Sequence, residues 1–167
     1  RAQVMKMSEA FSNVSDFILY VDDTRATLPE LFHFYNVRKQ FEIKTMKFVA
    51  KKARAFRAAL AYRKEVKESP EDAVFYVREG LLAFYLIFLS QKFRKNFFYE
   101  MHSFIRHKKI IYRVVCHFAR GVVSTSESKA KILQDVFRVL EGRIFVAPNV
   151  LDPVDFENIL SCEDVRR

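Results

Sequence analysis

Short apolar runs alternate with segments of helical period along most of the chain. Continuous apolar runs predict buried strands at 17–21 (FILYV), 73–77 (AVFYV), 96–101 (NFFYEM), 121–124 (GVVS) and 144–147 (IFVA). Helical patterns are predicted at 2–11, 28–35, 48–67, 80–93, 109–118 and 127–140. Segment 41–48 has no decisive period and is compatible with a strand.

Apolar strands that alternate with helices are typical of a parallel sheet covered by helices. We therefore predict an α/β fold, a Rossmann-like parallel sheet with helices on both faces and right-handed crossovers. A Rossmann domain opens on a strand and a glycine-bearing loop, whereas this chain opens on a helical pattern. The first strand of the sheet is therefore expected to be missing from the chain.

The composition agrees with a globular α/β domain. A chain of 167 residues with 18 Phe and 7 Tyr can bury a sizeable aromatic core. The longest apolar run, 81–89, is shorter than the roughly 20 residues that a bilayer-spanning helix needs. No signal-peptide pattern opens the chain, and Cys116 and Cys162 have neither pairing nor metal spacing. A cytoplasmic, reducing setting is expected.

The net charge of +9 is concentrated in one segment. Residues 44–67 hold nine basic side chains and one acid, Glu65, while the rest of the chain is nearly balanced. The expected helix in this segment aligns Val49, Ala53, Phe56 and Leu60 along one apolar stripe. The excess charge is therefore a localised basic surface rather than a property of the whole protein.

Like charges one helical turn apart, as in Lys47 and Lys51, are unfavourable by roughly 0.2–0.5 kcal/mol. An anionic partner would offset this repulsion, and the anionic face of a membrane suits an amphipathic helix. The candidate membrane contacts are Lys47, Lys51, Lys52, Arg54 and Arg57. A solvated basic face explains the pattern equally well. No nucleic-acid partner is expected, because no recognition motif accompanies the charge.

Polar residues that follow the strands are the candidates for a site, because ligands of open α/β sheets bind beyond the carboxyl ends of the strands. These candidates are Asp22, Asp23, Arg78, Glu79, Gly80, His102, Ser103, Ser124, Thr125, Ser126, Pro148 and Asn149. Neither a P-loop, a GxSxG motif nor a complete GxGxxG motif occurs, and no residues have metal-site spacing.

His102 is the strongest of these candidates. A histidine at a strand end can donate or accept hydrogen bonds next to a reacting group, although it could also merely cap the strand. Glu100 lies two residues earlier and so points to the same face, where it would orient a neighbour or form a buried ion pair with Arg78. Arg78 would hold an anionic acceptor group, or serve only in that ion pair.

Ser124 and Ser126 lie where a strand meets a helix. Ser124 and Glu127 have the spacing of a capping box, so helix capping accounts for these serines. Backbone N–H groups at the same place could also bind a hydroxyl or phosphate of an acceptor.

Four pieces of the chain, in this order, resemble the N-terminal half of family 4 glycosyltransferases of the two-domain B architecture. They are 2–22 (AQVMKMSEAFSNVSDFILYVD), 74–79 (VFYVRE), 98–102 (FYEMH), and the pair 122–126 (VVSTS) and 144–152 (IFVAPNVLD). The resemblance implies that residues 1–160 are a Rossmann-like N-terminal domain and that 161–167 begin a linker to a second domain.

The resemblance further implies a retaining transfer of sugar from a nucleotide-sugar to a saccharide or lipid-linked acceptor. His102 would face the donor sugar as the catalytic residue. The substrate-binding residues would be Arg78, Glu100, Ser103, Ser124, Ser126 and Asn149. No cofactor or metal is expected on this chain, which alone would be inactive, because the nucleotide-sugar would bind the second domain.

Two other functions remain open from the sequence. The fold could serve as a non-catalytic module that binds anions or a membrane surface, with peripheral attachment to the inner membrane face. A nucleotide-binding oxidoreductase domain is the third reading, and the missing glycine fingerprint counts against it.

Overall fold

The computed structural model describes residues 2–22, 27–46, 53–102 and 108–148 and separates the chain into two compact units. The first unit comprises residues 1–49 with 149–167, and the second comprises residues 50–148. Helices alternate with strands in both units, and every paired strand is parallel to its neighbour. This confirms the predicted α/β class with Rossmann-like parallel strands. That residues 1–160 act as one domain stays a prediction.

The first unit is built on a two-stranded parallel sheet. Its elements are α1 (Ala2–Ser12), β1 (Ile18–Asp22), α2 (Leu28–Phe34) and β2 (Glu42–Met46). The ambiguous segment 41–48 therefore contains a strand. A small core of Met5, Phe32, Phe41 and Ile43 closes the unit, with the rings of Phe32 and Phe41 packed edge to face at 5.2 Å.

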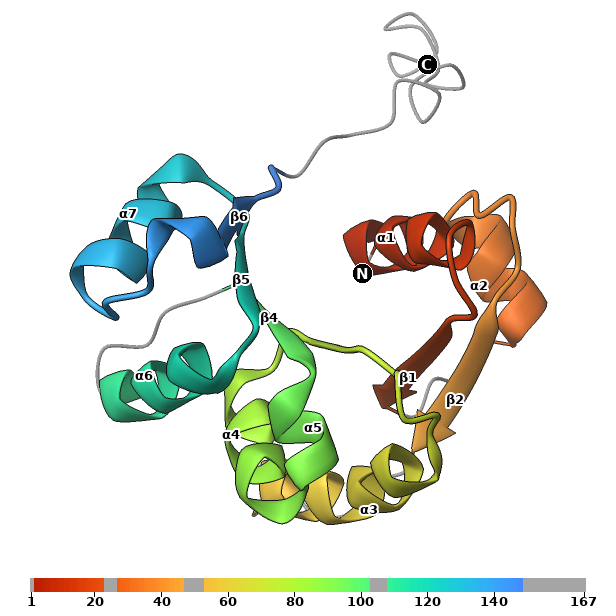
Figure 1. The fold of residues 1–167 in the computed structure, drawn as a ribbon. Coiled ribbons are helices and arrows are strands. Elements are labelled where there is room, and N and C mark those ends of the chain that lie inside the picture. Colours follow the sequence, from red (N-terminus) through yellow and green to blue (C-terminus); the bar gives the residue numbers. More distant parts are fainter. Residues whose placement is uncertain (1, 23–26, 47–52, 103–107, 149–167) are drawn as a thin grey trace, which may run out of the picture. The chain divides into compact units, whose positions relative to one another are not determined.

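The second unit is built on a four-stranded sheet of order β3-β4-β5-β6. Its helices are α3 (Arg54–Glu68), α4 (Gly80–Leu89), α5 (Gln91–Lys95), α6 (Lys109–Phe118) and α7 (Glu127–Asp135). Its strands are β3 (Phe75–Val77), β4 (Phe97–Met101), β5 (Gly121–Ser124) and β6 (Ile144–Val146), with a 3₁₀ turn, η2 (Glu141–Arg143), before β6. Each strand lies beside the next one in sequence, and α4, α6 and α7 lie along one side of the strand row (Figure 1).

The main core lies between this sheet and its helices. Phe97, Tyr99 and Met101 alternate along β4 and are almost fully buried, as is Val122 on β5. Leu133 of α7 packs in the same cluster. This alternation puts the intervening side chains of β4 on the opposite face of the sheet.

The expected helix at 80–93 is two helices, because Ser90 interrupts it. Ser90 is extended, with φ of −144°, and its side-chain oxygen accepts a hydrogen bond from the backbone N–H of Phe93 at 3.3 Å. Serine favours such capping positions over helix interiors because its hydroxyl satisfies a free N–H group. The helix expected at 127–140 likewise ends earlier, at Asp135, and Arg138 adopts a left-handed φ of 59°.

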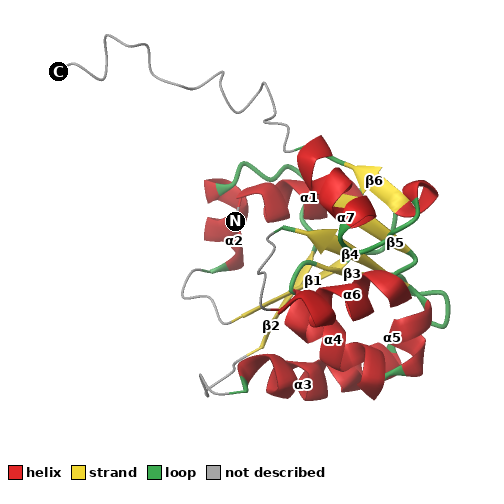
Figure 2. Ribbon diagram, turned by 90° about the vertical axis from the view of Figure 1, so that its left-hand side faces the viewer, coloured by secondary structure: helices red, strands yellow, loops and turns green. Residues whose placement is uncertain are grey.

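α3 turns a different side to the core than its apolar stripe indicates. Ala58, Ala59 and Val66 are buried, whereas Phe56 is 39% exposed and Leu60 44% exposed. Small alanines allow close approach to α4, against which α3 packs (Figure 2). The larger apolar residues of the stripe are therefore left at the surface.

Candidate functional site

Three strand ends bring candidate residues to the same edge of the four-stranded sheet. β3 ends at Val77, β4 at Met101 and β5 at Ser124, so that Arg78, His102 and Thr125 follow directly. The parallel register pairs Val77 with Tyr99 and Met101 with Ser124. Because parallel strands end at one edge, side chains far apart in sequence meet there, as the sequence predicted.

Arg78 and Glu100 form an ion pair at this edge. Arg78 Nη2 lies 3.0 Å from Glu100 Oε1, as an ionic contact rather than an aligned hydrogen bond. The Glu100 side chain is 2% exposed and that of Arg78 is 21% exposed. The ion pair weighed from the sequence is therefore present, and it compensates a carboxylate that would be costly to bury alone.

Tyr76 provides the second partner of Glu100. Its hydroxyl donates a hydrogen bond of 2.9 Å to Glu100 Oε2. Burial of the ring, reinforced by the neighbouring Glu100 carboxylate, raises the pKa of Tyr76 well above its usual range. The hydroxyl therefore stays protonated as a donor at neutral pH. The sequence analysis missed Tyr76, although its position two residues before Arg78 places both on one face of β3.

His102 lies at the outer end of this cluster. Its Nδ1 is 3.1 Å from Arg78 Nη2 and 4.0 Å from Glu100 Oε1, and its side chain is 57% exposed. A guanidinium group only donates hydrogen bonds, so Nδ1 accepts and the ring proton of the neutral histidine is on Nε2. The contact with Arg78 thus makes Nε2–H the donor that His102 offers to a ligand.

The end of β5 is organised by serines, but not as a Ser124 capping box. The N-cap of α7 is Ser126, whose hydroxyl oxygen accepts from the backbone N–H of Lys129 at 3.4 Å. Ser124 is fully buried, and its hydroxyl donates to the carbonyl oxygen of Ser126 at 2.8 Å. Capping of α7 by a serine is therefore confirmed, whereas the predicted capping box of Ser124 and Glu127 is wrong. Ser124 shapes the turn from within.

Lys129 joins the ends of β4 and β5. Its ammonium group donates to the backbone carbonyl of His102 at 3.1 Å and to the hydroxyl of Thr125 at 2.7 Å. It lies in the first turn of α7, four residues after Thr125. Lys129 was not among the site residues predicted from the sequence. A lysine in the turn after a strand end is the signal that could have found it.

The structure does not place most of the remaining predicted site residues. Ser103, Asn149, Lys47, Lys51, Lys52 and Asp23 lie outside the described residues, as does the side chain of Asp22. Arg54 and Arg57 are exposed on α3 and do not lie at a strand end.

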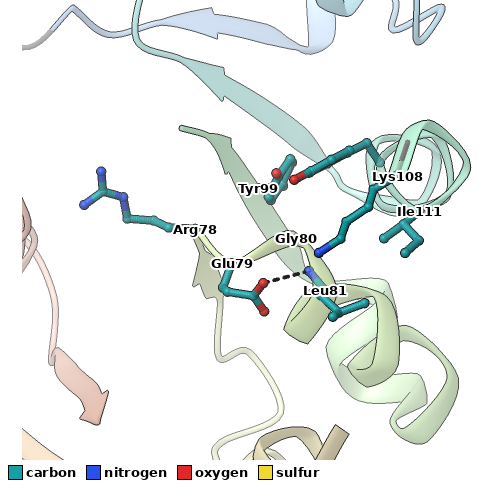
Figure 3. A pocket seen from close by; sticks show the side chains of 8 residues that line it. Arg78, Glu79, Gly80, Leu81, Tyr99, Lys108 and Ile111 are labelled. Atoms are coloured by element: carbon teal, nitrogen blue, oxygen red, sulfur yellow. Dashed lines mark hydrogen bonds between the residues drawn. The ribbon is translucent and has the colours of Figure 1, made fainter. Parts of the chain in front are cut away.

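A small pocket of about 130 Å³ opens beside the cluster. It is lined by Arg78, Glu79, Gly80, Leu81, Tyr99, Lys108, Ile111 and Tyr112. Glu79 caps α4, because its carboxylate accepts a hydrogen bond of 3.2 Å from the backbone N–H group of Leu81 (Figure 3). It also accepts one from the backbone N–H group of Leu82. Figure 3 also shows the Arg78 guanidinium pointing away from Glu79 and Lys108.

This pocket is a poor site for a sugar. Pockets for small molecules usually measure about 300–1,000 Å³, and the helix N-terminus that could attract an anion is already occupied by Glu79. The cluster on the other face of the sheet is therefore the stronger candidate.

Among the described residues, no group of histidine, cysteine, aspartate or glutamate side chains could hold a metal ion. In the same part of the chain no helix combines the length and apolar character required to cross a membrane. Comparison of the chain with protein-family models, with curated proteins and with solved structures finds no match.

Proposed function

We propose that this chain is the acceptor-side domain of a glycosyltransferase that transfers a sugar from a nucleotide-sugar to a saccharide or lipid-linked acceptor. The proposal depends on one observation. Arg78, Glu100 and His102 are in mutual contact at the carboxyl edge of a parallel sheet, the edge at which α/β sheets bind ligands.

The charge of the cluster favours a neutral, hydroxyl-rich ligand. The Glu100 carboxylate balances the Arg78 guanidinium at 3.0 Å and limits its attraction for an anion. What the cluster offers is a set of oriented hydrogen-bonding groups, which match the hydroxyl groups of a saccharide. Lys129 and Thr125, whose side chains are hydrogen-bonded to each other, extend this polar edge.

His102 is the group we assign to the reacting sugar. Its Nε2–H is directed by the contact between Nδ1 and Arg78, which is itself held by Glu100. A hydrogen-bond donor fixed in this way can stabilise charge that develops on an oxygen during transfer. In this proposal the nucleotide-sugar binds a second domain, and closure of the two domains excludes water, which would otherwise compete with the acceptor.

The test is a transfer assay on the product of the complete reading frame, with a panel of nucleotide-sugars and saccharide or lipid-linked acceptors. We expect His102→Ala to lower kcat about 100-fold or more, because one preorganised donor contributes roughly that factor. His102→Gln, which keeps an N–H donor near the position of Nε2, should retain more activity than His102→Ala.

Lys131→Glu provides a control, because Lys131 is exposed on α7. It should leave transfer unchanged. Absence of transfer with every donor, or a His102→Ala enzyme as active as the wild type, would contradict the proposal.

A further inference from the structure

The exposed side of α3 combines apolar and basic residues in one stripe. Phe56, Leu60, Arg63 and Lys67 follow one another at intervals of four, three and four residues, which places them along one side of a helix. Phe56 is 39% exposed and Leu60 is 44% exposed, and both basic residues are exposed. This stripe lies beside the side of α3 that buries Ala58, Ala59 and Val66.

α4 continues the apolar part of this surface. The helix contains no charged residue from Gly80 to Leu89, yet Phe88 is 65% exposed. The rings of Phe84 and Phe88 pack at 5.1 Å, and Phe56 of α3 meets Tyr85 of α4 at 5.2 Å. α3 and α4 lie side by side (Figure 2). Ring contacts connect Phe56 to Phe88 through Tyr85 and Phe84, so that these aromatic residues form one cluster.

Basic residues accompany this patch along α3. The helix holds five basic residues and two acids. One acid, Glu68, forms an exposed ion pair with Lys64 at 3.9 Å, so the helix keeps a positive charge in excess. We name Phe56, Leu60, Phe88, Arg57, Arg63 and Lys67 the basic-aromatic surface.

The chemistry of this surface fits an anionic bilayer better than a nucleic acid. Exposed apolar patches rimmed by polar residues mark interaction sites, and the interfacial region of a membrane accepts aromatic and leucine side chains while its anionic lipids attract lysine and arginine. Between Arg54 and Glu68, α3 carries no asparagine, glutamine, serine or threonine, so only its arginines and lysines could contact bases, and these suit lipid phosphates equally well. Leu60 has no aromatic face on which a base could stack, whereas leucine and phenylalanine both suit the interfacial region of a bilayer.

We propose that the basic-aromatic surface binds anionic lipid bilayers, with Leu60 and Phe88 entering the headgroup region and Arg57, Arg63 and Lys67 contacting lipid phosphates. The site is separate from the cluster of Arg78, Glu100 and His102. The proposal does not rest on sugar transfer, and either proposal can fail without the other.

The test is co-sedimentation of the 167-residue chain with vesicles of phosphatidylcholine, with and without phosphatidylglycerol. We expect binding to the anionic vesicles, weakened by salt, and little binding to phosphatidylcholine alone. The double variant Arg57→Glu/Lys67→Glu should lower the partition coefficient by at least about 25-fold, since each cation lost lowers it roughly fivefold. Leu60→Ser/Phe88→Ser should lower it by about tenfold or more.

Matched controls come from the same unit. Lys109→Glu/Lys131→Glu makes the same change in charge on α6 and α7. Ile110→Ser/Leu140→Ser removes two apolar side chains that are 79% and 70% exposed. Circular dichroism of all variants checks that they are folded. Both control variants should bind vesicles like the wild type.

Three results would overturn the proposal. The first is equal binding to both kinds of vesicle, or binding to neither. The second is an equal loss of vesicle binding in the control and the test variants. The third is displacement of the chain from anionic vesicles by a trace of single-stranded oligonucleotide. The last result would identify a nucleic acid as the partner of the same surface.

Discussion

The two faces of the four-stranded sheet differ in what they bury. On the helix-covered face β4 presents Phe97, Tyr99 and Met101, each no more than 1% exposed and surrounded by apolar side chains. On the other face the same strand presents Phe98 and Glu100, and the latter is equally buried but held by Arg78 and Tyr76.

This difference indicates that one face of the sheet mainly stabilises the fold, whereas the other holds the polar groups available for binding. The helix-covered face gains free energy from apolar area and dense packing. The other face buries an ion pair, which adds little net stability but fixes the orientation of the groups it contains. We therefore expect substitutions on the first face to act on unfolding, and those at the strand ends of the second to act on binding.

The largest expected effect is on the helix-covered face. Phe97 is fully buried and stacks on Phe93 at 4.6 Å, so Phe97→Ala should lower the free energy of unfolding by about 3–5 kcal/mol. Phe98→Ala should cost about 1–2 kcal/mol, because Phe98 is only half-buried. Urea unfolding followed by circular dichroism measures both. Equal losses would mean that the two faces do not differ in this way.

The ion pair comes next. Glu100→Gln leaves the partly buried Arg78 guanidinium without its carboxylate and should cost roughly 2–3 kcal/mol, less than for a fully buried pair because Arg78 is 21% exposed. The double variant Arg78→Met/Glu100→Leu should recover most of that loss. The comparison requires the unfolding free energies of the two variants and the wild type. A double variant as unstable as Glu100→Gln would show that the pair itself stabilises the fold.

Gly80, the first residue of α4, tests how closely α4 packs on α6. A Cβ atom at Gly80 would lie 2.8 Å from the Tyr112 ring and 3.0 Å from the Tyr99 hydroxyl. Gly80→Ala should therefore destabilise by about 1–3 kcal/mol, although alanine favours helices. Gly142→Ala is the control, since nothing lies within 4 Å of its Cβ position. Thermal unfolding should show a lower Tm for the first and an unchanged or slightly raised Tm for the second.

The smallest effect is expected for Tyr76→Phe, which removes the hydrogen bond to Glu100 and should cost about 1 kcal/mol. The folded-state pKa of Tyr76 is raised above the unfolded value, about 10 for a tyrosine. The contribution of the hydroxyl is thus fully present below pH 10 and is lost as the pH rises further. Unfolding free energies of both proteins should differ by a constant amount from about pH 6 to 9 and converge at higher pH. A difference that changes across the neutral range would contradict this assignment.

The strands and the meeting of their ends could be predicted from sequence, because buried parallel strands leave continuous apolar runs and parallel register brings their ends together. Arg78, Glu100 and His102 were found in this way. The orientation of α3 could not be predicted, because its two buried alanines carry less apolar signal than the exposed Phe56 and Leu60. The hydrophobic periodicity of the whole segment does not show which side of α3 packs against a neighbouring helix.

Local hydrogen bonds account for the other errors. Ser90 caps α5 and Ser126 caps α7. The sequence alone does not show which of the neighbouring serines Ser124 and Ser126 is the cap, or that a cap interrupts the long apolar segment 80–93. Tyr76 was not predicted as a site residue, because a tyrosine within an apolar strand is expected to belong to the hydrophobic core. Its role depends on the partner that β4 brings next to it.

In the proposed function, the ends of β3, β4 and β5 form one saccharide-binding edge. A ¹H–¹⁵N NMR titration of the 167-residue chain with acceptor saccharides tests it most directly. We expect saturable shifts at Arg78, His102 and Lys129, and unchanged signals from His117 near the end of α6 and from Lys131 on α7. Unmoved signals at the three strand-end residues, or equal shifts at His117 and Lys131, would contradict it.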